Sequence, residues 1–97
     1  MLEEVWRLQT DTITWQKVDD AVIVFDLRTS TSVSIDGPGV VIWEALTPGA
    51  NLDHLVRVVT ERFDVSEEIA RLDIHRFLVD LASRRMASSS KAEGRHR

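Results

Sequence analysis

The sequence predicts an α+β domain in which a three-stranded antiparallel sheet is followed by three helices. Two observations predict this order. Apolar and polar residues alternate through much of the first third of the 97-residue chain, as they do in half-buried strands. From about residue 36 onward, apolar residues recur every three or four positions, which is the spacing of one helix face. The length suits one small domain and leaves little structure for a deep catalytic cavity.

Three strands are expected between residues 12 and 35. Residues 12–16 alternate polar and apolar side chains, and Asp19-Asp20 supplies a turn. Residues 21–25 are apolar on both faces, which favours a central strand that is covered on both sides or flanked by two neighbours. Residues 31–35 alternate again, with Val33 and Ile35 on one face and serines on the other. This third strand is expected at an edge, where one row of N–H and C=O groups stays unpaired.

The first two helices have recognisable start signals. Asp36 is expected to cap the first helix, because aspartate is a favoured N-cap residue and Pro38 behind it fits a first helical turn. Thr47-Pro48-Gly49 ends that helix, and Asn51 is expected to cap the second. The second helix then carries its apolar residues on a single face, so both helices are expected to pack against the core.

The third helix carries two apolar stripes. It is expected to begin with a capping box formed by Asp64 and Glu67 and to run to about Met86. One stripe suits the main core. The second either packs against the sheet and the other helices or lines a groove with charged lips. Its members are Ile69, Leu72, Val79 and Met86, flanked by Asp73, Arg76 and Asp80.

Catalytic and metal-binding patterns are missing from the sequence. There is no cysteine, and the three histidines (His54, His75 and His96) lack the spacing of metal ligands. We therefore expect no enzyme activity, no metal and no cofactor. Since there is neither a secretion signal nor an apolar run long enough to span a membrane, we expect a cytoplasmic protein without a membrane partner.

The net charge of −4 is distributed unevenly. From Arg84 onward there are five basic residues and one acidic residue, so residues 1–83 carry −8. Such an acidic body repels a phosphate backbone, and no nucleic-acid partner is expected. We divide the chain into an N-terminal segment (residues 1–11), a folded domain (12–86) and a disordered basic tail (87–97). A DNA-binding regulator remains an alternative, because the order of elements is winged-helix-like.

Four parts of the sequence follow one another at a specific separation: residues 36–46 (DGPGVVIWEAL), Gly49, Phe63-Asp64 and residues 73–81 (DIHRFLVDL). Together they resemble the PqqD family of small recognition elements for ribosomally synthesised, modified peptides. The resemblance implies a non-catalytic winged-helix-like domain that binds the leader segment of a precursor peptide as an added strand, between its third strand and third helix. The chain is most similar to the free-standing leader-binding proteins of lasso-peptide biosynthesis. A chaperone-like role in quinone cofactor (PQQ) synthesis is a further alternative, although the Pro-Glu and Leu-Asn usual in those members are replaced here.

The resemblance also implies which residues contact the leader and which proteins act with this one. Leaders of the lasso group commonly present an aromatic residue and a proline to an apolar pocket, and a leader peptidase and a cyclase are the implied partners. The open edge also offers a second copy of the chain a place to pair when no leader is bound. An adaptor or inhibitor that binds a folded partner through the same surface is another alternative. The implied peptide-binding residues are Ser32, Val33, Ser34 and Ile35 on the strand, and Leu72, Asp73, Arg76, Val79 and Asp80 on the helix.

Overall fold

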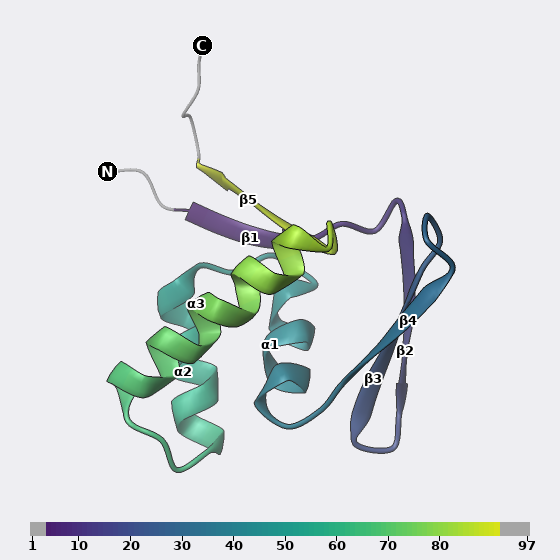
Figure 1. The fold of residues 1–97 in the computed structure, drawn as a ribbon. Coiled ribbons are helices and arrows are strands. Elements are labelled where there is room, and N and C mark those ends of the chain that lie inside the picture. The colour runs from purple at the N-terminus through teal and green to yellow at the C-terminus, as the bar shows by residue number, and fades with distance from the viewer. Residues whose placement is uncertain (1–3, 92–97) are drawn as a thin grey trace.

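Two small sheets and three helices make up residues 4–91, the part of the chain that the computed structural model describes (Figure 1). The predicted α+β class, with a three-stranded antiparallel sheet followed by three helices, is confirmed. In chain order the elements are β1 (Glu4–Leu8), β2 (Ile13–Val18), β3 (Ala21–Asp26), β4 (Thr31–Ile35), α1 (Pro38–Leu46), α2 (Leu52–Arg62), α3 (Glu67–Ser83) and β5 (Ala87–Lys91).

The larger sheet has the strand order β2-β3-β4, and both of its ladders are antiparallel. The apolar strand β3 is central because it has a neighbour on each side, as predicted. Val24 lies opposite Trp15 on β2 and Val33 on β4, and it is fully buried. The three helices lie on one side of this sheet (Figure 1). The other side stays open, since Phe25 on that face is 39% exposed.

The division of the chain at residues 12 and 86 is wrong. Residues 4–8 and 87–91 form strands β1 and β5, which pair with each other over their whole length, from Glu4 opposite Lys91 to Leu8 opposite Ala87. Trp6 also exchanges two backbone hydrogen bonds with Ala50, of 2.8 and 2.9 Å. Trp6, Leu8 and Ala87 are buried, so both strands belong to the folded domain. The rest of the predicted tail, residues 92–97, lies outside the described part of the chain, as do residues 1–3.

Truncation after Met86 is expected to destabilise the domain. It removes β5, which covers one edge of β1 and contributes buried Ala87 to the core. Loss of several backbone hydrogen bonds and of this apolar contact should lower the free energy of unfolding by about 2–4 kcal/mol. Urea denaturation measures the change. The control is truncation after Lys91, which keeps β5 and should leave the midpoint nearly unchanged; equal midpoints for both truncations would contradict a structural role for β5.

Two of the three predicted helix caps are wrong. Gly37 is the N-cap of α1, with φ +59°, and it makes no side-chain hydrogen bond. Ser66, and not Asp64, caps α3 by accepting the Ile69 N–H at 3.2 Å. The start of α3 is delayed because Val65 packs against the core in a non-helical connection. The Asn51 cap of α2 is confirmed, since its side chain accepts the His54 N–H at 2.8 Å.

The main core lies between the inner face of the larger sheet and the helices. Trp43 of α1 is fully buried at its centre and meets Trp15 of β2 edge to face, with ring centroids 5.9 Å apart. Such a contact adds to the large apolar burial of the two rings. It ties α1 to the sheet and so places the end of β4 beside the helices. No helix among residues 4–91 is long and apolar enough to span a membrane.

Candidate peptide-binding groove

Strand β4 presents an open edge. Within residues 4–91 it pairs with β3 and with no other strand, so one row of its N–H and C=O groups has no ladder partner. Thr31, Ser32 and Ser34 are exposed, Val33 is half-buried and Ile35 is buried. An edge of this kind can accept an extended peptide through main-chain hydrogen bonds.

Two contacts connect the ends of β4 with α3. At the Ile35 end, a Cβ atom added to Gly39 would lie 2.7 Å from Ile35 Cγ2 and 3.4 Å from Phe77 Cζ, so the three residues meet there. At the Thr31 end, the guanidinium of Arg28 in the β3–β4 turn donates to the Arg84 carbonyl at the end of α3, at 3.2 Å. The open edge of β4 therefore runs beside the C-terminal half of α3, in the opposite direction.

An apolar pocket opens near the Ile35 end of this groove. Its volume is about 240 Å³, and it is formed where α1, α2 and α3 meet. Asp73 is the one charged residue in its lining. A pocket of this composition suits an apolar side chain that carries a hydrogen-bond donor. The lining residues are Pro38, Gly39, Ile42, Val59, Phe63, Val65, Ala70, Asp73, Ile74 and Phe77.

The predicted helix residues do not all meet at this groove. Asp73 lines the apolar pocket, and Arg76 and Asp80 follow it at intervals of three and four residues, on the same exposed face of α3. Leu72 is 51% exposed and lines a different hollow, on the flank of α3 that faces α2. Val79 is 50% exposed. The predicted second stripe is therefore divided, and its last member, Met86, is buried in the core.

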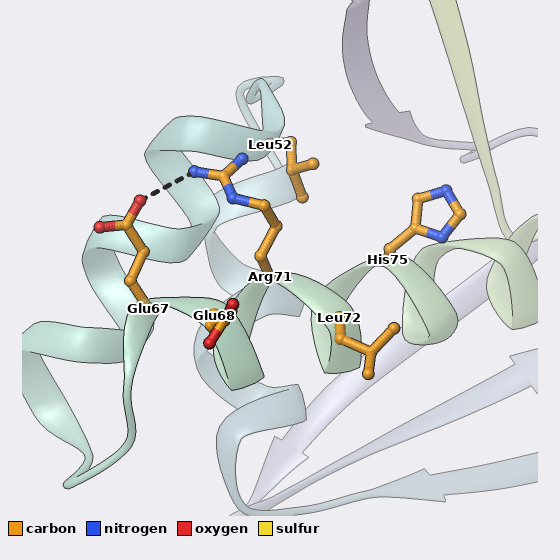
Figure 2. Close-up of a pocket in the computed structure, with 6 residues that line it drawn as sticks. All are labelled: Leu52, Glu67, Glu68, Arg71, Leu72 and His75. Atoms are coloured by element: carbon orange, nitrogen blue, oxygen red, sulfur yellow. Dashed lines mark hydrogen bonds and ion pairs between the residues drawn. The ribbon is translucent and has the colours of Figure 1, made fainter.

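The hollow on the α2 flank has a volume of about 650 Å³ and is open to solvent (Figure 2). Leu52 of α2 and Leu72 of α3 give it apolar walls. Arg71 is held across it by two ion pairs, with Asp53 at 2.9 Å and Glu67 at 3.2 Å. The hydrogen bonds to these two carboxylates raise the pKa of Arg71, so its positive charge is already engaged. Within the described residues no group of three or more histidine or acidic side chains could hold a metal ion.

The sequence did not indicate that Phe63, Val65 and Phe77 line a pocket. Phe77 belongs to the core stripe of α3, and Phe63 to the apolar face of α2. All three are only partly buried where they pack against the core. The one signal in the sequence was the expected break between the second and third helices at Asp64, where side chains leave a helical face.

Gly39→Ala is expected to narrow this pocket. The new methyl group must displace Ile35 or Phe77, and overpacking of this kind costs about 1–3 kcal/mol. Removing a helical glycine returns about 0.5–1 kcal/mol, so we expect a small net destabilisation and a several-fold weaker affinity for a peptide that fills the pocket. The control is Gly37→Ala, which meets no atom within 4 Å but is strained at φ +59°. The Gly37→Ala control should lose stability without losing affinity per folded molecule. Equal peptide affinities for Gly39→Ala and Gly37→Ala would contradict a role for the apolar pocket in binding.

Comparisons with known proteins agree with these features. Residues 21–87 match the family described as coenzyme PQQ synthesis protein D (PqqD). No curated protein matches the sequence significantly. Two solved structures have the same fold, each with a TM-score of 0.77. TbiB1 in complex with the TbiA(beta) leader peptide is 24% identical, over 94% of this chain and 99% of that one. A lasso peptide synthetase B1 complexed with the leader peptide is 20% identical, over 86% and 96% respectively.

Proposed function

Because the chain belongs to the PqqD family, we propose that it binds the leader segment of a ribosomally synthesised precursor peptide of the lasso type. The observation that carries the proposal is the open edge of β4 beside α3, with an apolar pocket at one end. Two proteins of the same fold are complexed with leader peptides, which supports it. The chain acts as a recognition element and performs no chemistry of its own.

In the proposed complex, the leader adds a strand to β4. Main-chain groups of Ser32, Val33 and Ser34 supply hydrogen bonds, and Val33 and Ile35 supply apolar contact. Asp73, Arg76 and Asp80 face the leader from α3. Leu72 and Val79 contact only those parts of the leader that cross the exposed crest of the helix, because they lie away from the pocket.

The module delivers the bound leader to a separate leader peptidase and a cyclase. Without a leader, the same β4 edge pairs with a second copy of the chain, since an unpaired edge is a template for another strand. Leader binding should therefore dissociate such dimers. Sedimentation of the chain with and without leader measures the fraction of dimer. A dimer that persists with saturating leader would show that its contacts lie outside the β4 edge.

Calorimetric titration tests the proposed function directly. The probe is the leader segment of the precursor encoded beside this gene, and we expect a dissociation constant well below 100 μM. Absence of binding at 100 μM, which corresponds to an affinity weaker than about −5.5 kcal/mol, would reject the proposal. The matched control is a peptide of the same composition in scrambled order, which should not bind.

A further inference from the structure

On the α3 side of the groove, Asp73 and Arg76 are the charged groups that are not engaged. Both side chains are exposed, and within residues 4–91 neither forms a hydrogen bond or an ion pair. Further toward the Thr31 end the charges are engaged: Asp80 is paired with Arg84 at 3.1 Å, and Asp26 with Arg28 at 3.1 Å. The free charges that α3 contributes to the groove are thus one negative and one positive group, three residues apart.

The two groups occupy different positions along β4. Asp73 lines the pocket that also contains Gly39, beside Ile35, so it marks the C-terminal end of the strand. Arg76 lies one helical turn further toward Arg84, whose carbonyl is bound by Arg28 at the opposite end of β4. Asp36, which directly follows β4, is exposed and adds negative charge at the Asp73 end. The groove is therefore negative near Ile35 and positive toward Thr31.

We propose that Asp73 and Arg76 select leaders that carry a basic and an acidic residue on the face turned toward α3. This inference rests on the proposed leader binding and specifies its chemistry. The rise between Asp73 and Arg76 is about 4.5 Å along the helix axis. Two residues of an extended strand that share one face lie about 6.7 Å apart. Flexible side chains span the difference, so the two leader residues are separated by one position.

The direction of the leader strand fixes their order. Both ladders of the sheet are antiparallel, and sheets of a single ladder type are favoured over mixed ones. A leader added antiparallel to β4 begins beside Ile35 and proceeds toward Thr31. It therefore places a Lys or Arg beside Asp73 first and an Asp or Glu beside Arg76 two residues later. The leader pattern is basic–any–acidic, read from its N-terminal side.

Charge reversal on both partners tests the proposal. We expect Asp73→Lys and Arg76→Glu each to weaken binding of the precursor's own leader by roughly fivefold, since an exposed attraction becomes a repulsion. Reversing the matching leader residue should restore the affinity to within about twofold of the original pair. At about 0.5 M salt the difference in leader affinity between each variant and the original chain should shrink, because exposed charges are screened there. Glu61→Lys and Arg57→Glu make the same charge changes on the exposed face of α2 and should leave the affinity unchanged.

The outcomes separate this inference from leader binding itself. If the leader binds but the two reversals change its affinity no more than the α2 controls do, the charge-pair inference is wrong and the proposed function stands. Rescue of Asp73→Lys by the second leader position, and not the first, would overturn the antiparallel order. A leader that binds with full affinity but has no charged residue at these two positions would overturn the charge-pair inference itself. Failure of the unaltered chain to bind any leader would reject the function.

Discussion

Proline substitution along β4 is expected to weaken leader binding strongly at alternate positions. Successive residues of a strand direct their N–H groups to opposite sides, so Ser32 and Ser34 share one direction and Val33 has the other. Proline at a position whose N–H faces the open side leaves the ladder with β3 whole but removes a donor to the leader. Proline at a position that faces β3 breaks that ladder. Variants with proline at a position whose N–H faces the open side should therefore fold and bind the leader weakly. Variants with proline at a position that faces β3 should have a lower free energy of unfolding.

Single-proline variants at positions 32, 33 and 34 provide the measurement, each followed by urea denaturation and by calorimetric titration with leader. For the variants that fold but lose a donor to the leader, we expect an affinity loss of about 10- to 100-fold, the equivalent of one or two hydrogen bonds. Ser32→Ala and Ser34→Ala are the matched controls, because they retain the backbone N–H and should bind within about twofold of the original chain. Three folded proline variants with unchanged affinity would exclude β4 as the docking strand.

The larger sheet and the helices could be predicted because their signals are local. Alternation identified the edge strand at residues 31–35, and a continuous apolar run identified the central strand β3. The β1–β5 pair could not be predicted in the same way. Its Ser88-Ser89-Ser90 stretch has no apolar alternation, and its partner strand lies about eighty residues away in the sequence. The one local hint in the sequence was the alternation of Trp6 and Leu8, which the structure buries, with polar Arg7 and Gln9.

The groove was predicted in outline and differs in detail for a similar reason. The strand edge and the charged face of α3 follow from the periodicity of single elements. The pocket arises where three helices converge with the Phe63–Val65 connection, and no single helical face encodes that meeting. Leu72 was expected at the groove because it belongs to the second apolar stripe of the helix and because the resemblance to the family implies a leader contact there. In the structure it instead lines the hollow that Leu52 of α2 also lines (Figure 2).

Asp26→Ala is expected to be the most destabilising of the polar substitutions, and to weaken leader binding as well. Asp26 is the one charged residue that is buried within residues 4–90, at 4% exposure. It accepts the Arg28 N–H at 2.9 Å and the Arg28 guanidinium at 3.1 Å. Removing the carboxylate leaves both donors without this partner and should lower the free energy of unfolding by about 2–3 kcal/mol. It also releases the guanidinium that binds the Arg84 carbonyl, so the spacing between β4 and α3 is no longer held.

Comparison with Asp26→Asn and Arg28→Met separates these two effects. Asparagine retains an acceptor for the Arg28 N–H but loses the charge, so its cost should be about half that of alanine. Arg28→Met leaves the carboxylate bonded to the N–H of residue 28 and removes the link to the Arg84 carbonyl. It should weaken leader binding several-fold, mostly through faster dissociation, while the chain stays folded. Since Arg28 lies in the turn before β4, full leader affinity in Arg28→Met would show that the groove keeps its width without this link.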